Sequence, residues 1–151
     1  MARILVVDDE PSIVKLVSVT LRARGHVTYE AHDGIEAIEQ AKALKPDLIL
    51  LDIMMPRMNG KQARKKLHED PETANIPVIH LSAVGDYESQ LEGMEDGLTD
   101  YITKPFAPKE LADHVDDFLD PAKRDAMKRL AHQKTGKLRT IVEIMHRERN
   151  D

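Results

Sequence analysis

Residues 4–9 read ILVVDD, a short apolar run that ends in two neighbouring aspartates. Later in the chain, residues 48–52 read LILLD and end in a third aspartate. Short runs rich in Val, Ile and Leu are typical of parallel strands that are buried on both faces. Because ligands of open parallel sheets bind outside the carboxyl ends of the strands, we expect Asp8, Asp9 and Asp52 to meet there.

Three carboxylates this close together repel one another, and the repulsion raises their pKa values unless a cation lies among them. A hard divalent ion that prefers oxygen ligands would neutralise such a cluster, and Mg²⁺ is the first candidate. The sequence therefore predicts a magnesium site beside one reactive carboxylate.

Patterns typical of strands and helices alternate along residues 1–119. Further apolar runs predict strands at residues 27–30, 77–81 and 99–102, and helical spacing, caps or breakers predict helices at residues 11–24, 34–44, 61–67, 86–96 and 108–119. The helix at 34–44 starts with a pair, Asp33 and Glu36, that resembles a capping box. Five alternating strand–helix units predict an α/β fold, a parallel sheet with right-handed crossovers.

Composition limits the class of protein. A chain of 151 residues is long enough for one domain, or one domain with an appendage. Without cysteine it has neither disulfides nor thiolate metal sites, which suits a reducing cytosol. The first apolar run is too short for the core of a signal peptide, and no run approaches the roughly 18 apolar residues of a membrane span. We expect a soluble, cytoplasmic protein.

Charge is unevenly distributed along the chain. Residues 1–119 carry 13 Lys/Arg and 22 Asp/Glu, a balance of −9, and residues 120–151 carry 9 and 5, a balance of +4, which together give the net charge of −5. The negative charge of residues 1–119 argues against nucleic acid binding by that part. The positive charge of residues 120–151 keeps nucleic acid binding as a weaker alternative. We expect a domain at 1–119 and a basic helical extension at 120–151.

Over about residues 2–119, the sequence resembles the receiver domain of bacterial and archaeal two-component response regulators. Four stretches carry the resemblance in the family's order and spacing: residues 4–11, 48–60 (LILLDIMMPRMNG), 78–83 and 100–106 (DYITKPF). The resemblance implies a flavodoxin-like (βα)5 fold, a doubly wound sheet with strand order 2-1-3-4-5.

The resemblance also implies roles for individual residues. Asp52 would be the nucleophile that takes a phosphoryl group from the phosphohistidine of a histidine kinase or phosphotransfer protein. Asp9 would bind Mg²⁺ directly and Asp8 mainly through water, while Asp52 and the backbone carbonyl of Met54 would complete the protein ligands.

Two further side chains would act on the phosphoryl group. Lys104 would neutralise its charge together with Mg²⁺, and Ser82 would donate a hydrogen bond to one of its oxygens. The family implies a cis peptide bond between Lys104 and Pro105. Ser82 and Tyr101 resemble the family's switch pair, in which the tyrosine moves inward and reshapes the surface of residues 84–118 for a downstream target. A half-buried tyrosine with an exposed hydroxyl explains Tyr101 equally well from sequence alone.

Several functions fit these patterns. The expected one is a single-domain phosphoacceptor switch that acts by protein contacts, because 32 residues after Leu119 are too few for a winged helix or a cyclase. The alternative is the receiver fragment of a longer DNA-binding or enzymatic response regulator. A phosphohydrolase with an aspartyl-phosphate intermediate would need a second acid where Met54 stands, and a nucleotide-binding domain would need a glycine-rich loop after the first strand.

The tail leaves three interpretations open. Asp120 and Pro121 predict a helix start, with helix to about residue 133 and a break at 135–136. An apolar stripe follows at Leu138, Ile141, Val142 and Met145. This extension could pack on its own domain or form a homodimer, dock a partner, or touch nucleic acid or membrane. The helix at 108–119 is acidic where receivers of winged-helix regulators usually carry arginines, which argues against their symmetric dimer.

Overall fold

The computed structural model describes residues 1–83, 98–126, 129, 140–141, 143–145 and 147. Within these residues, five parallel strands form one sheet in the order β2-β1-β3-β4-β5. The strands are β1 (Arg3–Val7), β2 (Val27–Ala31), β3 (Leu48–Asp52), β4 (Val78–Ala83) and β5 (Thr99–Lys104). The α/β fold and the strand order that the sequence implies are therefore confirmed.

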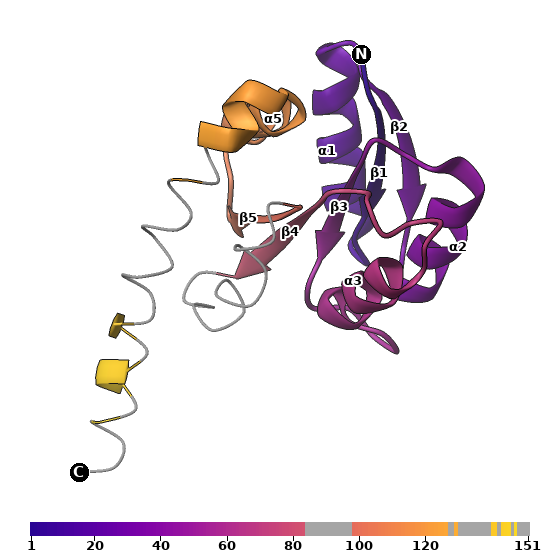
Figure 1. Ribbon diagram of the computed structural model, residues 1–151. Helices are drawn as coiled ribbons and strands as arrows, with labels where there is room; N and C mark the ends of the chain where they lie inside the picture. Colours follow the sequence, from indigo (N-terminus) through magenta and orange to yellow (C-terminus); the bar gives the residue numbers. More distant parts are fainter. Residues whose placement is uncertain (84–97, 127–128, 130–139, 142, 146, 148–151) are drawn as a thin grey trace.

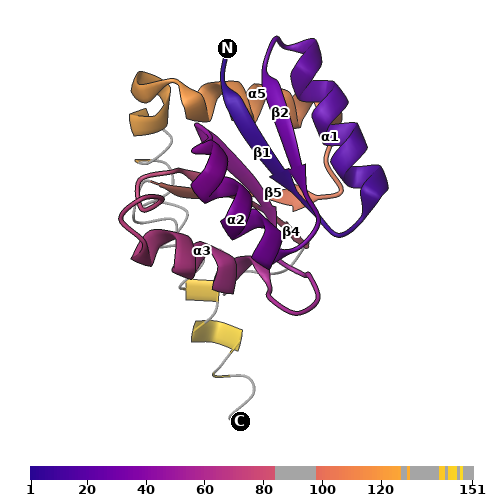
Figure 2. The same ribbon diagram turned by 90° about the vertical axis from the view of Figure 1, so that its right-hand side faces the viewer.

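Helices cover both faces of the sheet (Figure 1 and Figure 2). They are α1 (Pro11–Ala23), α2 (Gly34–Leu44), α3 (Gly60–Glu69) and α5 (Pro108–Leu119). One core cluster joins the sheet to α1 and α5, and a second joins it to α2 and α3. Alternate residues of β3 enter different clusters, Leu48 and Leu50 the first and Ile49 and Leu51 the second. Burial on both faces explains why this strand is a continuous apolar run.

Helix ends follow the caps that the sequence contains. Asp33 accepts the Glu36 backbone N–H at 2.8 Å, but the Glu36 carboxylate accepts the N–H of His32 and not that of Asp33. The reciprocal half of this capping box is thus displaced by one residue. A complete capping box begins α3, where Asn59 and Gln62 each accept the other's backbone N–H.

Two strands run further than the apolar pattern predicts. β4 continues to Ala83 and β5 to Lys104, and their ladder pairs Ser82 with Thr103. The predicted ends at 81 and 102 were wrong because the last residues of both strands are polar or small. Ser82 therefore lies within β4, and Lys104 is the last residue of β5 and does not follow it. The predicted helix at 86–96 lies outside the described residues.

The tail begins as predicted. Residues 121–126 are helical, and the Asp120 carboxylate accepts the N–H of Ala122 at 3.0 Å. The expected continuation to residue 133, the break at 135–136, and the stripe residues Leu138 and Val142 lie outside the described part. Ile141 and Met145 are helical and exposed. None of the helices in the described part is long and apolar enough to cross a membrane.

Candidate functional site

The carboxyl ends of β1 and β3 bring three acids together. Oxygen atoms of Asp8, Asp9 and Asp52, one from each carboxylate, lie within 4.8 Å of one another. Asp8 and Asp52 are buried, whereas Asp9 is exposed. One small cation can reach all three oxygens, and hard carboxylate oxygens are the donors that Mg²⁺ prefers. The donor set therefore fits the magnesium site that the sequence predicts.

Lys104 closes this cluster from the end of β5. Its Nζ atom lies 2.8 Å from one Asp8 oxygen and 3.3 Å from an Asp52 oxygen. The other Asp8 oxygen accepts the backbone N–H of Glu10 at 3.0 Å. Both Asp8 oxygens are thus engaged, while no hydrogen bond or ion pair joins the Asp9 side chain to a residue that the structure describes. The peptide bond after Lys104 is cis, as the resemblance implies.

The surroundings of Asp52 and Lys104 shift the pKa values of both side chains. Burial, followed by the negative charge of Asp8, raises the pKa of Asp52 from 3.8 to about 6, although Lys104 opposes the change. Burial alone would lower the pKa of Lys104, but its hydrogen bond to Asp8 and the negative charges of Asp52 and Asp8 raise it. Lys104 is therefore a permanent cation, and Asp52 is a carboxylate whose anion is costly to keep buried.

A groove of about 550 Å³ opens beside the acids. Asp9, Glu10, Asp52 and Lys104 line it together with the apolar residues Ile13, Leu16, Met54, Ala83, Pro105 and Phe106. Met54 is 75% exposed and Leu16 is 42% exposed. Exposed apolar side chains that adjoin a reactive group are typical of a surface that another molecule covers. No single stretch of the sequence reveals this groove, because its walls come from α1, the β3–α3 loop and the β5–α5 loop.

Gly60 supports the loop that follows Asp52. Its N–H donates to the Ile53 carbonyl at 2.8 Å. A Cβ atom at position 60 would collide with the Asp52 carbonyl oxygen and lie 2.9 Å from the Ile53 Cα. Only glycine fits this approach without a shift of the backbone that carries Asp52. The motif contains Gly60, but the sequence alone does not reveal the close contact.

The two residues of the predicted switch pair are both buried. Ser82 is 1% exposed, and its hydroxyl has no hydrogen-bond partner among the residues that the structure describes. Tyr101 is 8% exposed and is thus more than half-buried. An unpartnered buried hydroxyl is costly, and a ligand oxygen would satisfy it.

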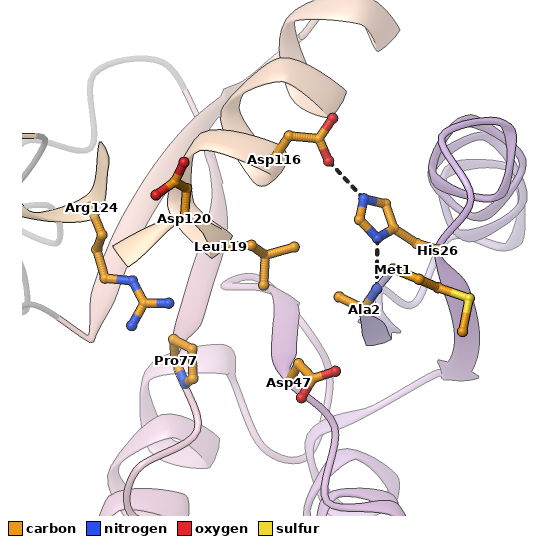
Figure 3. Close-up of a pocket in the computed structure, with 9 residues that line it drawn as sticks. All are labelled: Met1, Ala2, His26, Asp47, Pro77, Asp116, Leu119, Asp120 and Arg124. Atoms are coloured by element: carbon orange, nitrogen blue, oxygen red, sulfur yellow. Dashed lines mark hydrogen bonds and ion pairs between the residues drawn. The ribbon is translucent and has the colours of Figure 1, made fainter. Parts of the chain in front are cut away.

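The acidic face of α5 is engaged by contacts within the chain. Two Arg24 nitrogens lie 2.8 Å from the carboxylates of Asp113 and Asp116, and His26 Nε2 lies 2.7 Å from Asp116. Figure 3 shows His26 between Ala2 and Asp116, in a hollow of about 570 Å³ at the amino ends of the strands. The acids that distinguish this helix therefore attach it to the α1–β2 turn.

Comparison with known proteins decides the family. Residues 4–116 match the model of the response regulator receiver domain. The chain belongs to this family. It is a two-component receiver, a class of protein that accepts a phosphoryl group and switches protein contacts.

The curated relatives are longer than this chain. It is 42% identical over 115 residues to the DNA-binding dual master transcriptional regulator RpaA of Synechocystis sp., a match that covers 76% of this chain and 48% of RpaA. It is 45% identical over 113 residues to the phosphate regulon transcriptional regulatory protein PhoB of Escherichia coli, covering 75% of this chain and 49% of PhoB. The chain spans about half the length of these relatives.

Two solved structures of response regulators match the fold over nearly their whole length. A response regulator from Chloroflexus aurantiacus superimposes with a TM-score of 0.72 at 32% identity, covering 78% of this chain and 97% of that one. The chemotaxis response regulator CheY4 of Vibrio cholerae also gives a TM-score of 0.72, at 33% identity, and covers 78% and 98%.

Proposed function

We propose that Asp52 is the phosphoacceptor of this receiver. The observation that supports the proposal is its surroundings: a buried carboxylate of raised pKa, with Asp8 and Asp9 oxygens within 4.8 Å and the Lys104 ammonium at 3.3 Å. An Asp52 oxygen attacks the phosphorus of a phosphohistidine, the phosphorus–nitrogen bond breaks, and the imidazole leaves as an acyl phosphate forms. Phosphoryl transfer depends mainly on position and charge neutralisation, which this cluster can supply.

Asp9, Asp52 and the Met54 backbone carbonyl would hold Mg²⁺, with Asp8 acting mainly through water. The ion would neutralise negative charge on the transferred group. Lys104 would neutralise it from the other side, because its ammonium already lies between two acids and the open groove. The unpartnered hydroxyl of Ser82 would donate to a phosphoryl oxygen. Ser82 and Tyr101 would then form the switch pair.

The groove beside Asp52 is the proposed docking surface for the phosphodonor. A helix of a histidine kinase or phosphotransfer protein would lay an apolar face on Ile13, Leu16 and Phe106 and present its phosphohistidine to Asp52. The groove supports this occupant because the same cavity holds both the apolar lining and the reactive carboxylate. A downstream target would bind residues 84–118, and the extension at 120–151 would add contacts or allow a homodimer.

Two forms of output are compatible with this chemistry. The first is a cytoplasmic switch of one domain, residues 1–119, with its helical extension, which acts by protein contacts and not by binding nucleic acid. The second is the receiver part of a longer DNA-binding regulator, which is favoured by the match to only 48–49% of RpaA and PhoB. Acidic residues 113 and 116, which Arg24 already pairs, oppose the symmetric dimer usual for the second form.

A labelling experiment tests the phosphoacceptor. Incubation with Mg²⁺ and acetyl phosphate should add the mass of one phosphoryl group to the wild-type chain. Asp52→Asn should gain none, while the control Asp125→Asn, at an exposed aspartate, should label like wild type. Equal labelling of wild type and Asp52→Asn would mean that another residue is the acceptor.

A further inference from the structure

His80 is a histidine in the middle of β4, at a position where its neighbours Ile79 and Leu81 are aliphatic. It is 0% exposed. In the sheet it pairs with Leu51 of β3 on one side and with Tyr101 of β5 on the other. His80 therefore lies between the strand that carries Asp52 and the strand that carries Tyr101 and Lys104.

The chemistry of this imidazole is determined by its surroundings. Its Nδ1 atom lies 3.2 Å from the Leu51 carbonyl oxygen. Because a carbonyl oxygen only accepts, Nδ1 carries the hydrogen. Burial lowers the pKa of His80 to about 4, so that the ring is neutral at physiological pH. The hydrogen bond to the carbonyl fixes the plane of the ring beside the last residues of β3.

The other contact of the ring is Tyr101. The two ring centroids are 5.2 Å apart, and the ring planes are tilted by 34°. This spacing lies in the range in which aromatic pairs attract one another. Ser82 follows His80 by two residues on β4, so its side chain lies on the same face of the sheet. The orientation of the Tyr101 ring is therefore constrained next to the residue with which it would form a switch.

We propose that His80 is a positioning residue that holds Tyr101 in its buried orientation before any phosphoryl group is bound. The imidazole is hydrogen-bonded to the Leu51 carbonyl of β3, and its ring centroid lies 5.2 Å from that of the tyrosine. In the unphosphorylated receiver, Tyr101 thus already has the inward orientation of the proposed switch. This inference rests on the proposed function, in which Ser82 and Tyr101 report phosphorylation of Asp52.

The exposure of Tyr101 in the resting protein tests the proposal. The chain is labelled with 3-fluorotyrosine, and the Tyr101 ¹⁹F resonance is assigned with Tyr101→Phe. The shift of this resonance between H₂O and D₂O measures its contact with solvent, without Mg²⁺ or phosphodonor. His80→Leu should increase the solvent shift, whereas His80→Phe, which keeps a ring at this position but cannot donate to the Leu51 carbonyl, should increase it less. Ile79→Val, on the other face of β4, controls for general loosening of the core.

An unchanged solvent shift in folded His80→Leu would overturn the proposal, as would an equal increase in His80→Phe or in Ile79→Val. If His80→Leu does not fold, His80→Met takes its place. An increased solvent shift of Tyr101 in that variant then supports the proposal, and an unchanged shift overturns it. Addition of Mg²⁺ and the phosphoryl analogue beryllofluoride should return Tyr101 of His80→Leu toward the wild-type value. If wild type does not bind beryllofluoride, the phosphoacceptor function fails, but the resting comparison still decides the role of His80.

Discussion

The Lys104 ammonium donates to the Asp8 carboxylate at 2.8 Å, closer than its 3.3 Å distance to Asp52. The lysine thus neutralises the acid that is fully buried, and Asp9 is left exposed to solvent. This arrangement assigns different tasks to side chains that look alike in the sequence. It also gives each of them a separate experimental consequence.

Replacement of Lys104 by methionine should slow phosphorylation by on the order of 10²-fold, since a charge aimed at the transferred group is lost. Mg²⁺ should bind at least as tightly as in wild type, because the cation that competes for Asp8 is gone. Rates of acetyl phosphate labelling and a Mg²⁺ titration followed by NMR measure the two effects. If the variant lost both its Mg²⁺ affinity and its labelling, Lys104 would instead be a structural support of the acid cluster.

Mg²⁺ affinity should depend on Asp9 more than on Asp8. Both oxygens of Asp8 already have partners, Lys104 and the Glu10 N–H, whereas the Asp9 side chain has no partner among the described residues and can bind an ion directly. Asp9→Ala should therefore lose more Mg²⁺ affinity than Asp8→Ala in a titration of the two folded variants. A clearly larger loss in Asp8→Ala would exchange the two roles.

The buried anion of Asp52 should destabilise the metal-free fold near neutral pH. Its folded-state pKa of about 6 lies above the ordinary 3.8, so stability is retained below pH 3.8 and lost as pH rises toward 6. The loss is on the order of 3 kcal/mol. Asp52→Asn should thus be more stable than wild type in EDTA above pH 6, with a difference that shrinks toward pH 4.

Denaturant unfolding of both proteins from pH 4 to pH 7.5 measures this difference. His80 is present in both chains, so its own titration cancels in the comparison. A stability difference that stays constant across the range would show that the effect of the substitution is packing and not charge.

The phosphorylated state should be long-lived for this family. Hydrolysis needs a water molecule in line with the phosphorus, and the resembling family holds it with polar side chains at the positions of Met54 and Val84. Met54 lines the groove beside Asp52 and has no group that orients water, while Val84 lies outside the described residues. Met54→Asn with Val84→Glu should speed the first-order decay of phosphorylated protein in Mg²⁺ buffer. Decay no faster than that of wild type would remove these side chains as determinants of the lifetime.

Much of the fold is visible in the sequence because a parallel strand that is buried on both faces must be a continuous apolar run. The acids that follow such runs in β1 and β3 must share an edge of the sheet, which is why Asp8, Asp9 and Asp52 could be grouped before their distances were known. Strand ends were harder to predict, since Ser82 and Lys104 extend β4 and β5 with polar residues that break the pattern.

Other features depend on contacts between distant segments. The pairing of Arg24 with Asp113 and Asp116 joins residues that are far apart in the chain, so charge patterns within either segment do not reveal it. The same is true of the ring contact between His80 and Tyr101, which requires the register of β4 and β5. Local patterns identify the elements and the reactive residues, and packing decides which of them meet.

Reduction of the phosphorylated protein with borohydride tests the assignment of Asp52 most directly. Borohydride converts an acyl phosphate on aspartate into homoserine, which peptide mass spectrometry locates to a single position. After treatment with acetyl phosphate and Mg²⁺, homoserine should be found at position 52 and be absent when Mg²⁺ is removed by EDTA. Homoserine at position 8 or 9, or phosphorylated protein without any homoserine, would contradict the role of Asp52 as the phosphoacceptor.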